Sequence, residues 1–326
     1  MILYVVRILA QGALVIVVVS LLAFTMFRFV GDPVANMVGQ EASDADREEF
    51  AERLGLNDPL PVQFGRFLWD AARGEFGISY RQGRPVADLM AERLPATLEL
   101  ALLSATFALV FGVALGVYAA INRRGFVAHA AMTLSLVGVS LPTFLIGIGL
   151  IYVFAVELRW LPSFGRGEVV HVGWWTTGLL TESGRKSLVM PVLTLGFYQL
   201  TLIMRLVRSE MLETLRSDFI RFARARGIRE RTVQFRHALR NTMVPVVTIA
   251  GLQLGSVVAF SIVTETVFQW PGLGALFVNS VQFVDIPVMA TYLMFVAVVF
   301  VVVNLAVDLA YYALDPRLKG GNRGAP

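Results

Sequence analysis

The sequence has no cysteine, only three histidines and few charged residues for its 326 residues. Without cysteine, neither a disulfide framework nor a thiolate metal site can form. The histidines, His129, His171 and His237, stand singly and far apart, so we predict no metal site. Charged residues make up 16% of the chain and apolar residues 56%, against roughly 45–50% apolar residues in soluble domains. This composition is typical of a protein that lies in a lipid bilayer.

The sequence also lacks the motifs of common catalytic sites. Its nearest approach to a phosphate-binding loop, GLLTESGRKS at 178–187, has the wrong glycine spacing and lacks the Gly-Lys-Ser order. Neither HExxH nor GxSxG occurs, so an intramembrane protease would have no nucleophile or metal motif. We therefore predict that the chain has no catalytic residue, binds no cofactor and does not itself hydrolyse ATP.

Six apolar stretches are long enough to cross a bilayer, which needs about 20 residues. They predict an all-α membrane protein with six transmembrane helices, at 8–27, 98–120, 133–156, 188–207, 243–267 and 288–314. The first stretch is too long for a signal peptide and has no small-x-small cleavage site after it, so we interpret it as an uncleaved anchor. The fourth carries Pro191, Gly196, Tyr198 and Gln199, which suits a helix packed against protein rather than lipid.

Lysine and arginine predict the orientation, because short loops rich in these residues stay in the cytoplasm. Arg123 and Arg124 follow the second stretch, and many arginines follow the fourth. Segment 31–96, by contrast, has 7 basic and 12 acidic residues. Both termini are therefore expected in the cytoplasm and 31–96 outside. Helical patterns begin there at Ser43, Pro61 and Pro85 and indicate a small helical cap. We divide the chain into 1–30 with the first transmembrane helix, the cap at 31–96, and a transmembrane core at 97–326.

The segment 208–242 is unusual because eight arginines lie between Arg216 and Arg240. Ser217 or Asp218 is a suitable helix N-cap, and Gly227 is a suitable stop. The short helix between them places Phe219, Phe222, Ala223 and Arg226 at three- and four-residue spacings on one side.

A helix of about nine residues is not stable alone and needs a docking surface. A second helical pattern, 229–241, runs into the fifth apolar stretch, so movement of the first helix would pass to that stretch. Three interpretations stay open for the segment: a solvated loop that sets topology, a site for anionic lipid headgroups, or a docking surface for a cytoplasmic protein. Nucleic-acid binding is not expected, because no recognisable nucleic-acid fold accompanies the arginines.

Four blocks of sequence resemble one protein family. They are GEFGISYRQGRPVADLMAERLPATLELALL at 74–103, RFARARGIRERTVQFRHALRNTMVPVVT at 221–248, TETVFQWPGLGALFVNSV at 264–281 and DLAYYALDPRLKG at 308–320. They are similar, in matching order over nearly the whole chain, to permease subunits of the dipeptide, oligopeptide and nickel ABC importers. The resemblance implies the fold of a type I ABC importer permease in the bacterial cytoplasmic (inner) membrane, with six transmembrane helices, a cytoplasmic coupling helix and a helical extracytoplasmic cap.

The resemblance also implies the role of the arginine-rich segment, as a coupling loop at 208–242 that fits a cleft on an ATP-hydrolysing subunit. The residues expected to couple the two subunits are Phe219, Phe222, Ala223, Arg224, Arg226 and Gly227. The general importer motif reads Glu-Ala-Ala, three residues, then Gly, and Arg221 stands where that Glu would be. The arginines are therefore the expected polar contacts.

The partners that the resemblance implies are a second homologous permease, two ABC ATPase subunits or one fused subunit, a substrate-binding protein outside the membrane, membrane lipid and a peptide cargo. ATP and Mg would be used by the ATPase subunits. Two alternatives stay open: the same machinery could import nickel or another small solute, or the chain could be an ion channel or a stand-alone carrier.

Polar residues inside apolar helices are candidates for a translocation pathway. They are Tyr198, Gln199, Gln253, Glu265 and Asn304. Each could equally form an interhelical hydrogen bond, and Glu265 could be a solvated acid at the membrane interface. After the fifth stretch, Trp270 suits the lipid–water interface, and Pro271, Gly272 and Gly274 break the helix. We hypothesise that this turn helps to close an outer gate.

Overall fold

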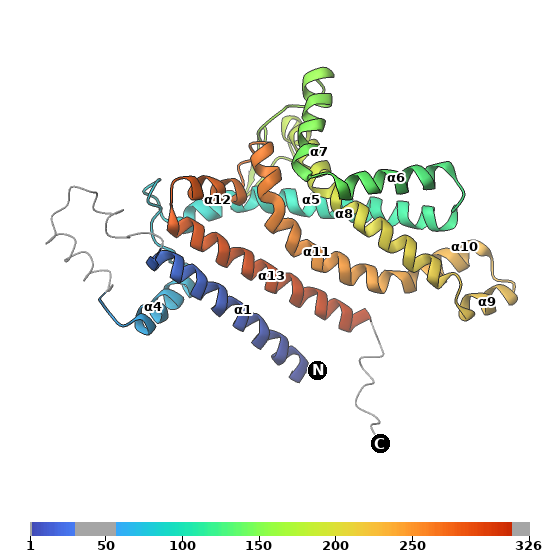
Figure 1. The fold of residues 1–326 in the computed structure, drawn as a ribbon, viewed down its shortest axis with the longest axis horizontal. Helices are drawn as coiled ribbons and strands as arrows, with labels where there is room; N and C mark the ends of the chain where they lie inside the picture. The colour runs from blue at the N-terminus through green and yellow to red at the C-terminus, as the bar shows by residue number, and fades with distance from the viewer. Residues whose placement is uncertain (1, 30–56, 315–326) are drawn as a thin grey trace. The chain divides into compact units, whose positions relative to one another are not determined.

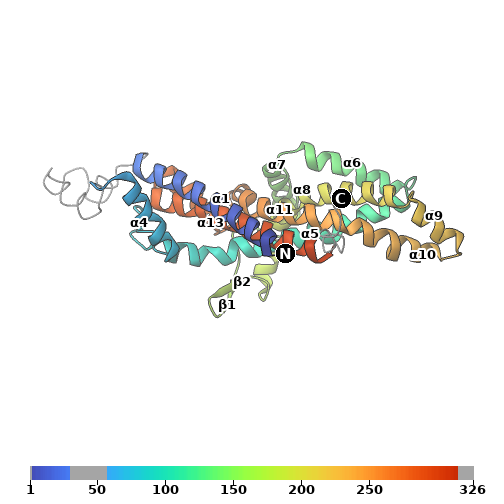
Figure 2. The ribbon, with the colours of Figure 1, turned by 90° about the horizontal axis from the view of Figure 1, so that it is seen from below.

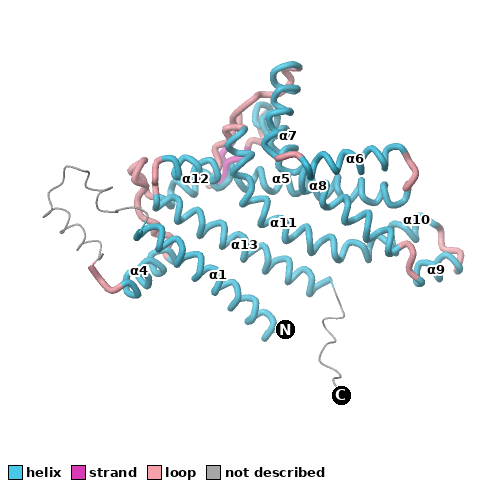
Figure 3. Tube along the Cα trace, in the orientation of Figure 1, coloured by secondary structure: helices cyan, strands magenta, loops and turns pink. Residues whose placement is uncertain are grey.

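The computed structural model describes residues 2–29 and 57–314, and this part of the chain is mostly helical (Figure 1, Figure 3). It divides into two compact units. The first contains helices α1 (Ile2–Phe29), α4 (Leu60–Ala72), the start of α5 (Val86–Ile121), α12 (Leu273–Gln282) and most of α13 (Ile286–Leu314). The cap helix expected after Ser43 lies outside the described residues.

The second unit contains the rest of α5 and the elements that follow it up to Trp270, together with the end of α13. These elements are α6 (Phe126–Ser140), α7 (Thr143–Leu150), η1 (Ile151–Glu157), β1 (Val170–Val172), β2 (Trp175–Thr177), α8 (Glu182–Thr214), α9 (Asp218–Ala225), α10 (Glu230–Thr232), η2 (Val233–Ala238) and α11 (Leu239–Val267). The two strands form an antiparallel hairpin, with His171 opposite Thr176 (Figure 2).

Helix α5 joins two predicted elements into one. The helical pattern that begins at Pro85 continues without a break through the second apolar stretch, so α5 has 36 residues. The expected boundary between cap and core, at residue 96, therefore lies within a continuous helix, and the division into these domains stays a prediction. The pattern at Pro61 forms a separate helix, α4, and Phe24 of α1 packs against its Phe64 and Phe67 with ring centroids 5.5 and 5.8 Å apart.

The prediction that the third apolar stretch forms one helix over 133–156 is wrong. The stretch forms α6 and then α7 with η1, and these two parts are bent by 112°. The cause is Pro142, because a proline disfavours helical geometry at the residue before it. Leu141 accordingly has an extended backbone, with φ −90° and ψ 136°, and Pro142 becomes the N-cap of the next helix.

The number of membrane spans follows only in part. Among the described residues, three helices are long and apolar enough to cross a membrane, or up to five if each of two bent pairs forms one span. Residues 10–26 of α1 form a shorter apolar helix. The chain therefore has membrane-spanning helices, while the count of six stays a prediction.

Glycines let helix α8 approach its neighbours closely. Gly112 and Gly116 of α5 lie over the backbone of α8, where a β-carbon on Gly116 would lie 2.7 Å from the carbonyl oxygen of Met204. Gly138 of α6 similarly faces Phe197 and Thr201 of α8. In lipid there is no hydrophobic driving force between helices, so they associate largely through van der Waals packing. Small residues at the contact allow the helices to come close enough for such packing. Helix α8 is therefore the central packing element of the second unit.

A buried ion pair attaches the hairpin to α5. Both Nε and Nη2 of Arg166 donate to Glu99 Oε2, at 3.2 and 2.6 Å, and Arg166 also donates to the carbonyl oxygen of Thr176 at 2.6 Å. The second carboxylate oxygen of Glu99 accepts hydrogen bonds from the Thr177 hydroxyl and the Gly178 N–H. Each charged group thus has several hydrogen-bond partners, which offsets the cost of burying both side chains.

We expect Gly116→Ala to destabilise the chain by about 1–3 kcal/mol, because the added carbon would press on Met204 and Val207 of α8. Gly149→Ala in α7 is the matched control, since nothing lies within 4 Å of a β-carbon there. The variants are compared by their thermal midpoints in detergent, measured from the fraction of each chain that remains monodisperse in size-exclusion chromatography after heating. A Gly116→Ala midpoint equal to that of the wild type would contradict the close α5–α8 contact.

Candidate functional site

Helix α9 has the ends that the sequence predicts. Ser217 is its N-cap, although the serine hydroxyl donates back to the carbonyl oxygen of Thr214 instead of capping the helix. Gly227 follows the helix with φ +73°. The Gly227 N–H bonds to the carbonyl oxygen of Arg224 and the Ile228 N–H to that of Ala223, which is the Schellman pattern of a left-handed C-terminal residue. The role of Gly227 as a helix stop is confirmed.

The eight residues of α9 present two different surfaces. Ile220 and Ala223 are buried against the chain's own core, whereas Phe219 and Phe222 remain 46% and 64% exposed. The guanidinium carbon of Arg226, also exposed, lies 5.7 Å from the centroid of the Phe222 ring. Ala223, which we grouped with the phenylalanines, is therefore turned toward the core and supports the helix from below. Two aromatic rings and a cation form the free surface.

The buried side of α9 belongs to a core that continues deep into the helical bundle. One apolar cluster contains Ile220 and Ala223 together with buried residues of α5, α8, η2 and α11. These residues are Ala108, Val117, Ala120, Leu200, Ile203, Val207, Met211, Leu215, Val233, Ala238 and Val246. A displacement of α9 therefore has to move the helices that share this cluster or break their packing.

An ion pair ties α9 to the next helix across the Gly227 turn. Arg224 donates from Nη2 to Glu230 Oε1 at 2.7 Å and from Nε to Glu230 Oε2 at 3.1 Å. The hydrogen bonds from Arg224 hold the pKa of the Glu230 carboxyl below its ordinary value, and the same bonds raise the pKa of Arg224. Arg224 thus has a partner within the chain, and its predicted contact with another subunit stays a prediction.

The pattern at 229–241 forms consecutive helical segments, α10, η2 and α11, from Glu230 to Val267. The turn after α9 therefore leads into a helix that continues through the fifth apolar stretch, as predicted. The middle segment, η2, is a π-helix, a conformation that is frequent at functional sites.

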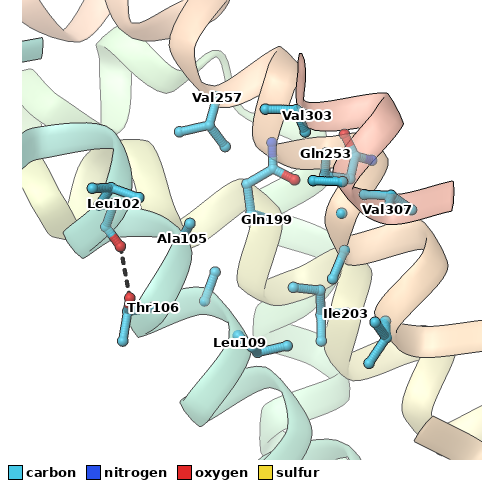
Figure 4. Close-up of a pocket in the computed structure, with 15 residues that line it drawn as sticks. Leu102, Ala105, Thr106, Leu109, Gln199, Ile203, Gln253, Val257, Val303 and Val307 are labelled. Carbon is cyan, nitrogen blue, oxygen red and sulfur yellow. Dashed lines mark hydrogen bonds between the residues drawn. The ribbon is translucent and has the colours of Figure 1, made fainter. Parts of the chain in front are cut away.

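A second candidate site is an apolar cavity of about 410 Å³ among α5, α8, α11 and the end of α13. Two of the predicted pathway residues, Gln199 of α8 and Gln253 of α11, line it (Figure 4). Gln199 is only 6% exposed, and its Oε1 has no hydrogen-bond partner among the described residues. The cavity walls are otherwise aliphatic apart from Thr106, whose hydroxyl donates to the carbonyl oxygen of Leu102 within α5.

The other predicted pathway residues do not line this cavity. Tyr198 lies on a more exposed part of α8, and Asn304 of α13 has a buried Oδ1 without a partner among the described residues. Glu265 is fully buried and accepts a hydrogen bond from the Ser261 hydroxyl at 3.0 Å, so its interpretation as a solvated interfacial acid is wrong. The structure therefore brings together only the two glutamines.

The predicted gate residues lie at a sharp break between helices. Trp270 is fully buried instead of exposed at an interface, and its N–H bonds to the carbonyl oxygen of Glu265 at 2.8 Å. The prediction that Trp270 lies at the lipid–water interface is wrong. Its ring lies beneath Arg166, and the guanidinium carbon of Arg166 is 5.9 Å from the centroid of the tryptophan ring. After Pro271, Gly272 is the N-cap of α12 and Gly274 is buried in its first turn. The helix break is confirmed, while the gate itself stays a prediction.

Sequence reasoning missed two buried acids. Glu99 pairs with Arg166, 67 residues away, and Asp285 accepts hydrogen bonds from the Ser79 hydroxyl and the Tyr80 N–H. For Glu99 there was a signal, because an ionisable residue at the start of an apolar stretch requires a partner. Its partner could not be identified from the sequence, since nothing local connects the two residues.

Comparison with known proteins places the chain in a family. Residues 112–320 match the family described as the binding-protein-dependent transport system inner membrane component, and residues 1–101 match the N-terminal part of such membrane components. A dipeptide transport system permease protein DppB of Alkalihalophilus pseudofirmus is 36% identical over 318 residues, covering 94% of this chain and 96% of that protein. A glutathione transport system permease protein GsiC of Escherichia coli (strain K12) is 38% identical over 303 residues, covering 93% and 94%.

The fold agrees with this relationship. A chain of the MetNI methionine ABC transporter, solved in inward-facing conformations, has a TM-score of 0.54 and 20% identity to this chain, with 70% of this chain and 96% of that chain covered. The expected fold of an ABC importer permease is thus confirmed. The chain belongs to the family of binding-protein-dependent transport system inner membrane components.

Proposed function

We propose that this chain is a permease subunit that carries dipeptides and other short peptides into the cell, driven by ATP hydrolysis in partner subunits. The family supports the role in transport, and the names of the dipeptide and glutathione permeases support the class of cargo. The observation that carries the proposal is the two-sided surface of α9, which buries Ile220 and Ala223 in the bundle and leaves Phe219 and Phe222 exposed.

The proposed orientation has six spans, both termini in the cytoplasm and residues 31–96 outside. Asn122, at the end of α5, and Arg231 of α10 line the same cavity, so the α5–α6 turn with Arg123 and Arg124 lies at the end of the bundle that carries the arginine-rich segment. This placement supports the assignment, because both positively charged segments then lie on the inner side of the membrane.

In the proposed mechanism, α9 docks in a cleft of an ABC ATPase. Its exposed aromatic rings enter the cleft, and Arg226 adds a charged contact. Closure of two ATPase subunits around ATP and Mg²⁺ would displace α9, and the shared apolar cluster would pass this displacement to α5, α8 and α11. The Arg224–Glu230 ion pair links α9 to α10 across the Gly227 turn.

Alternating access requires differential contacts in two states. A second, homologous permease completes the pathway, and a substrate-binding protein delivers peptide from outside. The apolar cavity with Gln199 supports a part in the pathway, because its unpartnered oxygen can accept a hydrogen bond from a peptide N–H without selecting a side chain.

The importer as a whole should accumulate peptide only with ATP. Proteoliposomes that contain the chain, its second permease, the ATPase subunits and the binding protein should take up labelled di- to pentapeptides when ATP is supplied, and should not accumulate nickel ions. Vesicles that contain this chain alone should transport nothing. ATP-independent uptake by the single chain would instead indicate a stand-alone carrier.

We expect Phe222→Ala to reduce ATP-driven peptide uptake by about tenfold or more, because exposed aromatic side chains are typical anchors of protein interfaces. Phe126→Ala is the control, since Phe126 is also an exposed phenylalanine, 86% exposed, but lies on α6 and not on α9. The absence of native cysteine also lets Phe222→Cys be crosslinked without background. Unchanged uptake by Phe222→Ala, with no crosslink from Phe222→Cys to the ATPase, would contradict the docking of α9.

Gln199→Leu should lower uptake by about fivefold, which is the effect of losing one hydrogen bond of about 1 kcal/mol. The thermal midpoint should not fall, because the substitution removes a buried oxygen that has no described partner. Thr201→Val is the control, since this residue of α8 faces Gly138 of α6 rather than the cavity. Full uptake by Gln199→Leu would exclude a contact between Gln199 and the cargo.

A further inference from the structure

A separate cavity, which is polar and has a volume of about 570 Å³, lies between α6 and α8 near the end of the bundle that carries α9. Met132 supplies its α6 wall, and the α8 wall is formed by Arg205, Arg208, Ser209, Leu212, Glu213 and Arg216. The spacing of these residues, three or four apart, places them along one face of α8. This surface is separate from the exposed rings of α9 and from the cavity that contains Gln199.

The side chains of the three arginines in this cavity have no partner in the described part of the chain. None of these side chains forms an ion pair or a hydrogen bond with a described residue, although Glu213 lies on the same wall. The Nε of Arg208 is also buried without a hydrogen-bond partner. A buried N–H that gives up water without gaining an acceptor destabilises a protein. An anionic group with several acceptor oxygens would satisfy this N–H and the other guanidinium donors of the cavity.

The chemistry of the arginines indicates which anion fits. The guanidinium fork matches the oxygens of a phosphate, and two such groups close together can share one phosphate. The wall opposite them continues into an apolar surface of α6, because Leu136, one turn after Met132 on the same face, is 56% exposed. A ligand that has a phosphate and long apolar chains satisfies both surfaces, whereas inorganic phosphate satisfies only the first.

We propose that this cavity binds the headgroup of an anionic phospholipid. Arg205 and Arg208 hold the phosphate, and the acyl chains lie along the exposed apolar face of α6. Basic cavities between membrane helices on the cytoplasmic side are suited to such headgroups. The lipid would hold α6 against the part of α8 that precedes α9. The proposal depends on the membrane location of these helices and not on the cargo.

The test is a lipid titration of the full-length, detergent-solubilised chain, followed by native mass spectrometry. The wild type should bind phosphatidylglycerol more tightly than phosphatidylcholine, which has no net charge. An arginine in contact with an anionic headgroup contributes about fivefold to its affinity, so Arg208→Gln should weaken phosphatidylglycerol binding about fivefold and the double variant R205Q/R208Q about 25-fold. Arg124→Gln is the matched control, because Arg124 is exposed on the α5–α6 turn, and it should bind as the wild type does.

The variant Arg205→Lys/Arg208→Lys keeps both charges and should keep the preference for phosphatidylglycerol, which separates loss of binding from misfolding. Each variant should also elute from size exclusion as a single species. Equal binding of phosphatidylglycerol by the wild type and by R205Q/R208Q would overturn the proposal. Displacement of the lipid by inorganic phosphate alone would overturn it in favour of a free anion. Loss of ATPase association in R205Q/R208Q, with lipid binding unchanged, would assign the cavity to the partner protein.

Discussion

The burial of Ile220 and Ala223 is the contact on which the functional arrangement depends. A helix of eight residues cannot maintain itself in water, and a polar, arginine-rich loop would ordinarily remain mobile. The buried side chains of Ile220 and Ala223, together with the hydrogen bonds at Gly227, make α9 part of the apolar core of the membrane bundle. Because the core is closely packed, a displacement of α9 in the proposed mechanism would be passed to the neighbouring helices. The same anchoring decides which residues remain available to a partner, and these are the phenylalanines.

The bundle that receives this displacement is packed through small residues and through few, well-satisfied polar groups. Gly112 and Gly116 allow the backbones of α5 and α8 to approach closely. At the hairpin, Glu99 and Arg166 satisfy each other and several backbone groups, so this end of the second unit is held by a buried network. Against this background the unpartnered groups stand out. Gln199 in its apolar cavity and Arg208 beside α6 are both buried polar groups that lack an acceptor or donor from the described chain.

The fold was predictable where the signal is local. Apolar length identified the helices, while the orientation inferred from the arginine distribution stays a prediction. Serine and glycine marked both ends of α9, and the resemblance of whole sequence blocks indicated the family. Prediction failed where one residue changes a long helix or where burial depends on distant partners. Pro142 bends the third stretch by 112°, although its hydropathy is that of a continuous span. Trp270 and Glu265 are residue types suited to an interface, yet both are fully buried. Arg166, far away along the chain, covers Trp270, whereas Glu265 accepts a hydrogen bond from Ser261, one turn earlier in the same helix.

The sequence by itself therefore determined that this is a helical membrane protein, where its short arginine-rich helix begins and ends, and to which family it belongs. These properties follow from composition, spacing and capping, which act over a few residues. Only the tertiary structure decided that Ala223 faces inward while Phe222 faces outward, that Arg224 is paired with Glu230, and that Gln199 and Gln253 share one cavity. Such facts depend on which helices pack together, and the physical reason is that the partner of a buried group is chosen by the fold and can lie at any distance along the chain.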